Sequence, residues 1–536
     1  MGGQPRNSIL ALSLALTGAC YSPAEYAEQA DAEVLPMLEL AQVDVLGDRE
    51  ATLLQPEPAP PDEPAMEDGH VAPPPAPAEP ADAQPIDLDG ALATAFSSSR
   101  EYLNAKEDLY LQGLSLSLAR YDFGPVLDST IAMLWQDAED SDSETRTTGL
   151  LGVSQILPDG GTFNLAGTLG TSWFGGGEGP DGDDPAYDSN AGFTLQQPLL
   201  RGFGYEVSHE ALTQAERDLV YAVRDFELFR EDFCISIADE FFALVSQQQQ
   251  IVVLQQTYED SVFDQHKAEA MRQVDRNEDE AVFLARRRAI DTENLLLQAQ
   301  SDYTEAVSRF KLRLGLPAEV PVVIEDDEPP FLPVALDADS AVAVAVHNRL
   351  DLKNAAGRLE DDERSVRIAA DGLLPQLDLT LGGGLDDSAG DPAEALPDEW
   401  SSTAALSLGL PVNRQAERNA YRSAQINLDQ ARRDYQQLVD DVDREVRDLL
   451  QQIRTIELRI ELQRGQITDE QRAVAVSQIR YEAGDVDNRD LLDARASLAR
   501  AQNELIALLA EHLSIRLRLM RAMGILVIEP DGSWKA

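Results

Sequence analysis

The sequence contains little cysteine and little positive charge. Its two cysteines, Cys20 and Cys234, are too few for a disulfide framework. Lysine and arginine number 43 against 96 aspartate and glutamate residues, and the formal net charge is -53. A charge of that sign opposes binding to nucleic acid or to an anionic bilayer surface. We therefore expect no nucleic-acid partner.

Long apolar runs are also missing beyond the N-terminus. No later stretch has the roughly 18 uncharged apolar residues that a membrane-spanning helix requires. A chain of this kind could cross a membrane only as a closed β-barrel, which satisfies every backbone polar group in lipid. The five histidines are scattered, and no spacing of histidine, cysteine and acidic residues suggests a metal site. No nucleophile–base arrangement appears either, so we expect no metal, no cofactor and no enzyme activity.

The N-terminus has the features of a targeting segment. Residues 8–19 are short, apolar and preceded by Arg6, which predicts a signal peptide over 1–19. The sequence Gly18-Ala19-Cys20 resembles a bacterial lipobox, although Thr17 stands where leucine is usual. We expect Cys20 to carry lipid such as palmitate, with ordinary cleavage near Ala19 as the alternative. Residues 20–85 are then a lipid-anchored segment that leads into a linker rich in Pro, Ala and Glu.

The strongest signal is an internal repeat. Leu195, Pro198 and Arg201 recur as Leu408, Pro411 and Arg414, 213 residues later. A second matched block recurs at a constant offset of 250 and pairs Ala91, Ala93, Ala95, Ala105 and Pro125 with Ala341, Ala343, Ala345, Ala355 and Pro375. The repeats span 86–320 and 321–526, and 527–536 form a C-terminal tail. Each repeat reads as short helix, strands and a long helical hairpin.

Long helices dominate both repeats. Residues 207–273 contain neither proline nor glycine, and at 1.5 Å per residue such a helix is about 100 Å long. Apolar residues recur at coiled-coil spacing, as Phe229, Phe233, Ile237, Phe241 and Leu244 and again as Leu438, Val442, Val446, Leu450 and Ile453. Returning helices over 279–315 and 488–524 end at Gly315 and Gly524, which fit the C-cap position. Cys234 lies in the first seam and is expected to be buried.

Short alternating strands precede each hairpin. We expect strands over 126–135, 149–157, 162–174, 193–197, 376–382 and 404–410, and the turn 158–161 predicts a hairpin. The acid-rich segments 137–148, 175–190 and 386–400 are expected to be loops on the outer side. Pro125, Pro198, Pro375 and Pro411 mark the junctions of barrel and helices. Whether the extra hairpin over 149–174 enlarges the barrel or lies against it stays open.

In combination these motifs resemble the TolC-type outer-membrane efflux proteins over about residues 86 to 526. The residues that carry the resemblance are Gln197-Pro198-Leu199-Leu200-Arg201-Gly202, Asn348-Arg349-Leu350-Asp351-Leu352, Leu374-Pro375-Gln376-Leu377, Leu408-Gly409-Leu410-Pro411, Tyr481 with Gly484, and Asp490 with Asp493-Ala494-Arg495. The resemblance implies an α+β membrane protein. It would be a homotrimer in which each subunit gives four strands to one outer-membrane β-barrel, continued by an α-helical coiled-coil barrel in the periplasm.

The same resemblance implies the function and the partners. The protein would be a passive export duct of a tripartite efflux or type I secretion system. It would sit in outer-membrane lipid and work with a periplasmic adaptor (membrane fusion) protein and an inner-membrane transporter. The alternative is a non-conducting periplasmic coiled-coil lipoprotein with a structural role in the envelope. The paired alternating strands favour the duct, because a spacer needs none.

The tip of the second hairpin carries the candidate entrance residues. Asp490 and Asp493 follow Gly484 at the spacing of the family's entrance aspartates and share a helix face. In a trimer they would form a carboxylate ring that favours cations, although acids at a helix N-terminus are also favoured by the helix dipole. Tyr481 matches the tyrosine that helps to close the tip, whereas Val486 stands where the family has arginine. The first hairpin tip, residues 272–279, lacks the family glycine.

Overall fold

The computed structural model describes residues 22–46, 84–138, 141–174, 186–273, 279–317, 319–325, 331–389, 399–483, 488–530 and 532–535. These residues form two compact units, and each unit takes segments from both sequence repeats. The first unit lies within 1–47, 109–223 and 354–436, and the second within 48–108, 224–353 and 437–536. The two compact units therefore do not coincide with the two sequence repeats.

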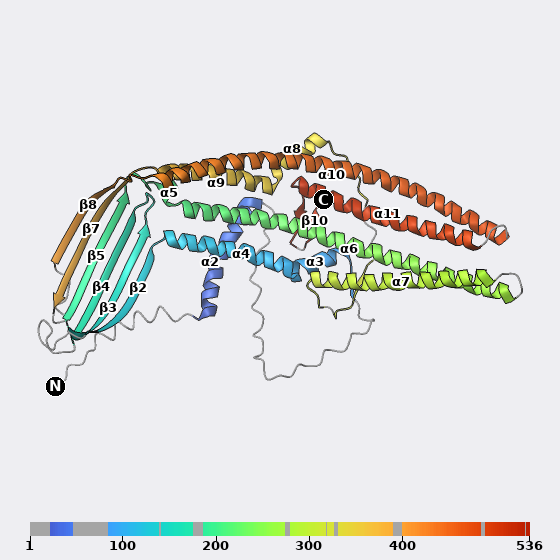
Figure 1. Ribbon diagram of the computed structural model, residues 1–536, viewed down its shortest axis with the longest axis horizontal. Helices are drawn as coiled ribbons and strands as arrows, with labels where there is room; N and C mark the ends of the chain where they lie inside the picture. The colour runs from blue at the N-terminus through green and yellow to red at the C-terminus, as the bar shows by residue number, and fades with distance from the viewer. Residues whose placement is uncertain are drawn as a thin grey trace, which may run out of the picture. The chain divides into compact units, whose positions relative to one another are not determined.

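Both repeats run from two helices through strands to two long helices, and the first repeat has β3, β4 and α5 in addition (Figure 1). The first repeat runs through α3 (Leu88–Ser98), α4 (Arg100–Phe123), β2 (Val126–Ala138), β3 (Ser141–Ile156), β4 (Thr162–Phe174), β5 (Ala186–Pro198), α5 (Tyr205–Ser208), α6 (Glu210–Gln273) and α7 (Asp279–Arg313). The second runs through α8 (Ala338–Asn348), α9 (Leu350–Asp371), β7 (Gln376–Ala389), β8 (Glu399–Gly409), α10 (Gln415–Ala483) and α11 (Asn488–Ala522). A further helix, α2 (Pro23–Leu46), precedes both.

Capping explains where the equivalent helices begin and end. Asp87 and Asp337, 250 residues apart, accept hydrogen bonds from the backbone N–H of Gly90 and Ser340 and cap α3 and α8. The single first helix expected from the sequence is instead two helices, because the chain breaks at Ser99, whose backbone is extended. The predicted C-caps are confirmed, since Gly315 and Gly524 have φ of 82° and 63° after α7 and α11.

The first unit contains a six-stranded antiparallel sheet in the order β2-β3-β4-β5-β7-β8 (Figure 1). The extra hairpin, β3 and β4, therefore lies inside the sheet between β2 and β5. The expected loop over 137–148 is wrong, because β2 continues to Ala138 and β3 begins at Ser141. Residues 186–190 and 386–389, also expected in loops, belong to β5 and β7. Arg146 of β3 forms an ion pair with Asp188 of β5 across β4, so polar residues of these segments have partners within the sheet.

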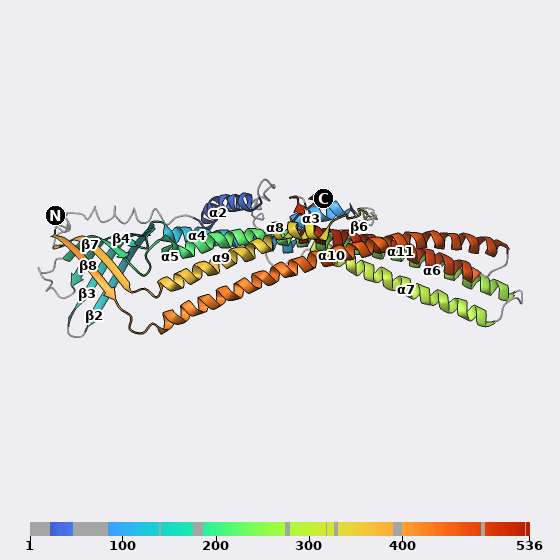
Figure 2. The same ribbon diagram turned by 90° about the horizontal axis from the view of Figure 1, so that it is seen from above.

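The second unit is built on long paired helices (Figure 2). Its seam is the one read from the sequence: Phe233, Ile237 and Phe241 of α6 and Val446 of α10 are at most 2 % exposed. Tyr303 of α7 reaches Gln248 of α6. Gln463 of α10 donates to the Ala501 carbonyl of α11, so each helix lies beside its returning partner.

The C-terminal segment is a folded part of the second unit. Strands β9 (Val527–Ile528) and β10 (Trp534–Lys535) pair antiparallel where the sequence suggested only a tail. The buried guanidinium of Arg230 donates to the Ile528 and Glu529 carbonyls. Cys234 is fully buried as expected, and burial raises the pKa of its thiol to about 12. Strand β1 (Gln84–Ile86) pairs parallel with β6 (Val322–Ile324) in the same unit.

Candidate functional site

Strand register places most of the apolar side chains of the sheet on one face. Leu127 of β2 lies opposite Val153 of β3, Val153 opposite Leu165 of β4, and Leu165 opposite Phe193 of β5. Directly paired residues point to the same side, and alternate residues along a strand share that side. The continuation across β7 and β8 follows the same phase, since Leu379 lies opposite Leu406. This apolar face therefore extends over all six strands.

The side chains of the apolar face are exposed. Leu127, Ile131, Leu151, Leu169, Leu406 and Leu408 are each 59–69 % exposed. The alternate positions form a mostly polar face that includes Thr130, Ser154, Thr168, Thr194, Thr380 and Ser407. A sheet with one exposed apolar face and one polar face suits a wall between lipid and water.

Three of the four tryptophans lie near one end of the apolar face. Trp135, Trp173 and Trp400 occupy the strand ends beside the β2–β3, β4–β5 and β7–β8 connections, and all are at least 58 % exposed. Tyr187 lies at the same end, opposite Thr171. Amphipathic rings of this kind gather where a membrane meets water. Their common level marks a candidate interface.

The opposite end of the sheet joins the helices. Pro125 lies between α4 and β2, and Pro375 lies between α9 and β7. Pro198 is the last residue of β5, and Pro411 lies between β8 and α10. The segment that follows β5 is tied to the start of β7, since the Leu199 amide donates to the Leu377 carbonyl at 2.7 Å. All four prolines thus stand at strand–helix junctions.

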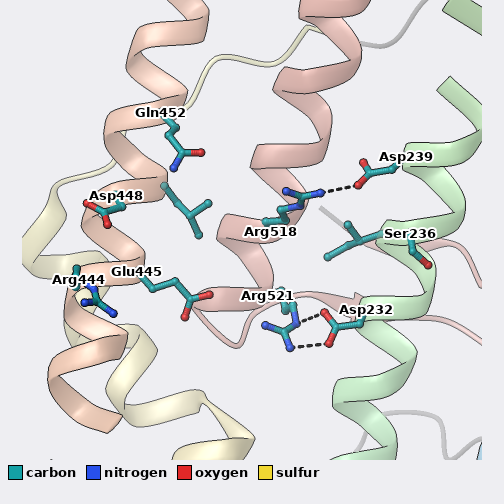
Figure 3. Close-up of a pocket in the computed structure, with 11 residues that line it drawn as sticks. Asp232, Ser236, Asp239, Arg444, Glu445, Asp448, Gln452, Arg518 and Arg521 are labelled. Atoms are coloured by element: carbon teal, nitrogen blue, oxygen red, sulfur yellow. Dashed lines mark hydrogen bonds and ion pairs between the residues drawn. The ribbon is translucent and has the colours of Figure 1, made fainter. Parts of the chain in front are cut away.

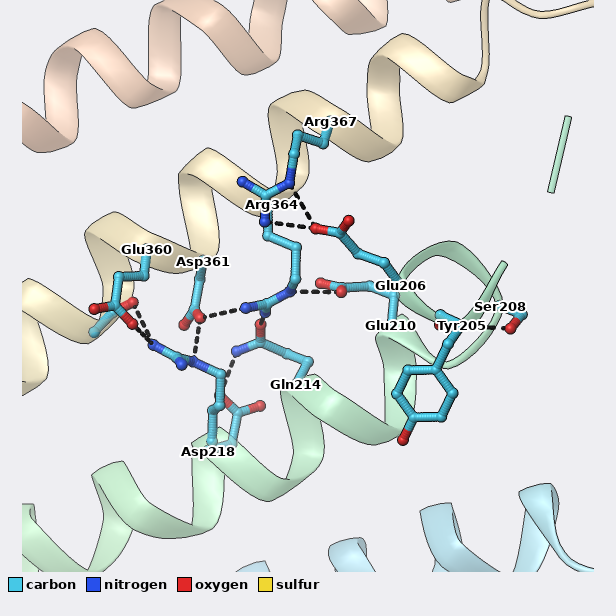
Figure 4. Close-up of polar contacts among 12 residues, drawn as sticks. Tyr205, Glu206, Ser208, Glu210, Gln214, Asp218, Glu360, Asp361, Arg364 and Arg367 are labelled. Atoms are coloured by element: carbon cyan, nitrogen blue, oxygen red, sulfur yellow. Dashed lines mark hydrogen bonds and ion pairs between the residues drawn. The ribbon is translucent and has the colours of Figure 1, made fainter. Parts of the chain in front are cut away.

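A cluster of charged side chains close to these junctions fixes α5 and α6 against α9 (Figure 4). Arg364 of α9 is 8 % exposed and donates to Glu210 at 2.6 Å, to Gln214 at 2.8 Å and to Asp361 at 3.0 Å. Arg367 pairs with Glu206 of α5. One buried guanidinium therefore satisfies three acceptors on two helices.

The same cluster continues one turn along α6. Arg217 pairs with Glu360 and Asp361, and the Tyr221 hydroxyl donates to Asp361 at 2.7 Å. Burial raises the pKa of Tyr221 to about 12, and the hydrogen bond to the Asp361 carboxylate adds to this rise. The tyrosine therefore stays protonated at neutral pH, and the cluster acts as a structural clamp between α6 and α9.

The candidate entrance residues lie partly outside the described residues. Gly484 lies outside them, as does Cys20, and Tyr481 is in the last turn of α10. Asp490 and Asp493 are exposed in the first turns of α11. Arg288 of α7 donates to Asp493 at 3.2 Å, a contact that sequence reasoning missed. It joins residues 205 positions apart, and no local pattern signals it.

A cleft of about 530 Å³ lies between α6, α10 and α11 in the second unit (Figure 3). Arg518 pairs with Asp239, and Arg521 pairs with Asp232, so α11 is linked to α6 along the wall of the cleft. Glu445 on the opposite wall pairs with Arg349. The ion pairs of Arg518 and Arg521 link the two long hairpins by charge. They form no nucleophile and base pair.

Two kinds of feature are absent from the part of the chain that the structure describes. No helix in it is long and apolar enough to cross a membrane. No group of three or more His, Cys, Asp or Glu side chains in it is arranged to hold a metal ion.

Residues 342–525 match the family model described as "Outer membrane efflux protein". The match covers most of the second repeat, from α8 to the end of α11, and confirms there the resemblance seen in the sequence motifs. None of the curated proteins compared with the chain matches it.

Three solved outer-membrane proteins have the same fold. The outer membrane protein VceC of Vibrio cholerae is 16% identical, with a TM-score of 0.59 over 82% of this chain and 96% of that one. The CmeC outer membrane channel of Campylobacter jejuni is 15% identical, with a TM-score of 0.59 over 82% and 85%. The MtrE outer membrane channel of Neisseria gonorrhoeae, in its open state, is 14% identical, with a TM-score of 0.56 over 83% and 90%.

The fold is that of outer-membrane channels with long helical hairpins. Within it, residues 342–525 carry the sequence pattern of the outer membrane efflux proteins.

Proposed function

We propose that this protein is an outer-membrane channel that serves as the passive exit duct of an export system. It acts as a homotrimer, in which the sheets of three subunits close one β-barrel and the long helices form a tunnel in the periplasm. Solutes enter at the helical tips and leave at the end of the sheet that carries the tryptophans. The fold match and the family match over residues 342–525 support this proposal.

The observation that carries the proposal is the one-sided sheet. Most of its exposed leucines, and Trp135, Trp173 and Trp400, share one face across six strands, and the other face is mostly polar. Exposed apolar area of this extent needs an apolar environment, because burying apolar surface contributes roughly 25 cal/mol per Å². Lipid on one side and water on the other satisfy both faces.

The strand edges support a trimer. Among the described strands, β2 and β8 each pair on one side only. An unpaired strand edge is not tolerated in lipid, since each unsatisfied backbone group costs several kcal/mol. Six strands cannot close on themselves around a water-filled lumen, whereas copies of the sheet can join β8 of one subunit to β2 of the next. Three subunits is the number that the family resemblance implies.

The remaining parts follow from this role. Cys20 holds the lipid anchor after removal of residues 1–19, and residues 20–85 link it to the first repeat. Residues 86–320 and 321–526 supply the two hairpins. The hairpin tips dock on a periplasmic adaptor protein, and through it on an inner-membrane transporter. The prolines at 125, 198, 375 and 411 set the turn between barrel strand and helix, because proline cannot continue a ladder or a helix.

The entrance charge is carried mainly by Asp490. Asp490 makes no hydrogen bond or ion pair to the residues that the structure describes, whereas Asp493 is paired with Arg288. We expected both carboxylates in a cation-favouring ring. Because Asp493 is paired with Arg288, we propose that Asp490 carries the larger share of the entrance charge and that Asp493 also helps to join the hairpins. Tyr481 and Gly484 then shape the closed tip.

The rival reading, a non-conducting envelope lipoprotein, explains less. A spacer would have no use for an exposed apolar sheet face with an aromatic end. No enzymatic role is needed for a passive duct, and the charged cluster around Arg364 serves to hold helices together.

Single-channel recording in planar bilayers tests the proposal. Purified trimers should give discrete conductance steps, and the current should be carried mainly by cations. Trimers that insert stably and yet leave the bilayer silent at every voltage would favour the envelope lipoprotein.

A further inference from the structure

The β3–β4 hairpin is an integral part of the sheet. It pairs with β2 along Val126–Gln136 and with β5 along Thr162–Ser172, so hydrogen-bonded ladders cover both of its sides. A hairpin that lay against the outside of a barrel would leave β2 paired with β5. The structure instead places two whole strands between them.

The turn of this hairpin is built into the strand–helix junction. The Gly204 amide donates to the Asp159 carbonyl at 3.1 Å, and the Ser208 hydroxyl donates to the Pro158 carbonyl at 3.1 Å. Gly160 has φ of 86°, and a Cβ there would come within 2.3 Å of the Gly202 carbonyl oxygen, so only glycine fits. The segment that leads from β5 into α6 is therefore shaped around the turn.

The alternation of side chains along β3 and β4 is a third, independent indication that the hairpin belongs to the sheet. Leu151 of β3 and Leu169 of β4 lie on the apolar face and are 59 % and 69 % exposed. Thr168, the neighbour of Leu169, lies on the polar face with Asn190 opposite. The hairpin continues the two faces of the sheet without a change of phase, as a strand in the wall of a barrel must.

We propose that the hairpin widens the exit, and that the membrane part of the duct is an 18-stranded barrel. The inference rests on the proposed trimer, because three copies of a six-stranded sheet make 18 strands. The resemblance alone implied four strands from each subunit and therefore 12. Barrel diameter grows roughly linearly with strand number, so the barrel is about 1.5 times as wide.

The width has a consequence for the solutes that leave. Barrels of 16–18 strands enclose an aqueous channel, and here the lumen is lined by the polar face with Thr130, Ser154 and Thr168. The exit thus passes large hydrated polar solutes without stripping their water. The limit on solute size lies in the helical part of the duct.

A deletion tests the width. Removing residues 141–174 takes out β3 and β4 and leaves β2 and β5, whose apolar residues Leu127 and Phe193 already lie at one level of the same face. Single channels of both proteins are recorded with poly(ethylene glycol) of graded size added only on the side of the tryptophan-rich end. We expect the largest polymer that enters to be about 1.5-fold smaller in radius for the deletion variant.

The recordings distinguish failure of the 18-stranded barrel from failure of the proposed function. Equal cut-offs in the two proteins would overturn the 18-stranded barrel and leave the export duct in place. Silence of both proteins would contradict the proposed function itself.

A second measurement decides the matter if the deletion variant does not fold. Nitroxides are attached to full-length Leu169→Cys and Thr168→Cys proteins in lipid bilayers. The label at 169 should be relaxed by lipid-soluble oxygen, and the label at 168 by a water-soluble nickel chelate. Water exposure at both positions would place the hairpin outside the wall and overturn the proposal.

Discussion

The substitution Arg364→Met should loosen the clamp between α6 and α9. Methionine keeps much of the aliphatic volume of arginine and removes the guanidinium. Glu210 then loses its 2.6 Å partner and Gln214 its 2.8 Å donor. Asp361 keeps Arg217 and Tyr221, so the loss concentrates at Glu210.

The expected magnitude follows from burial. Breaking a buried ion pair costs about 3–5 kcal/mol because the remaining charge is left in a poorly solvated place. The Glu210 side chain is 25% exposed, so water recovers part of that loss. We therefore expect unfolding free energy to fall by about 2–3 kcal/mol. The loss of unfolding free energy for Arg364→Lys should be smaller than that for Arg364→Met but not zero, since one ammonium cannot hold three acceptors in the same fork geometry.

The assay is a urea titration of the purified protein in detergent, followed by far-UV circular dichroism. Arg432→Ala is the matched control, because Arg432 also pairs with α9, through Glu363, and its side chain is 51% exposed. That change should cost less than about 1 kcal/mol. Equal losses for the Arg364 and Arg432 variants would show that burial of the guanidinium does not set the cost.

Three further predictions concern the entrance, the second unit and the anchor. Asp490→Asn should shift the reversal potential away from cation preference more than Asp493→Asn does, because Arg288 already compensates the charge of Asp493. Equal shifts would mean that both carboxylates contribute equally to a ring at the entrance. Burial lowers the pKa of His512 below its usual 6.5 in the folded protein. As the pH falls below about 6.5, the imidazole therefore binds a proton in the unfolded chain more readily than in the folded chain, and the free energy of unfolding should decrease. His512→Phe should flatten that acid slope, and an unchanged slope would assign it to other groups. Cys20→Ser should abolish incorporation of labelled palmitate, and a persistent label would place the lipid elsewhere.

Periodicity in the sequence predicted the helical seams well. Phe233, Ile237, Phe241 and Val446 are buried as their spacing required, because long helices keep one face turned to the partner over many turns. The C-caps at Gly315 and Gly524 were predictable for a local reason, since few other residues accept positive φ.

The strand boundaries were harder to predict. Residues 141–148 are acidic and hydroxylated, and in isolation they resemble a loop. Their strand conformation depends on ladders with β2 and β4, which are non-local. The phase of Leu151 and Leu169 was present in the sequence, but its meaning required the register of neighbouring strands.

Contacts between the two hairpins could not be predicted. Arg288 meets Asp493, and Arg518 meets Asp239, across more than 200 residues of sequence. Charges of either sign occur all along these helices. Which pairs meet is decided by the axial register of one hairpin against the other, and apolar spacing along a single helix leaves that register undetermined.

Tryptophan quenching by brominated lipids measures whether one face of the sheet meets lipid. Four proteins are prepared, each with one native tryptophan and phenylalanine at the other three positions. Trp135, Trp173 and Trp400 lie on the exposed apolar face, and Trp534 lies in β10 of the second unit and serves as the internal control. A fifth protein with Thr168→Trp as its only tryptophan reports on the polar face.

If the apolar face meets lipid, quenching is strong at Trp135, Trp173 and Trp400, and strongest from bromines placed near the headgroups. Quenching is then weak at Trp534 and at position 168. Quenching at 135, 173 and 400 no stronger than at 534 would contradict a lipid-facing sheet and, with it, the outer-membrane duct.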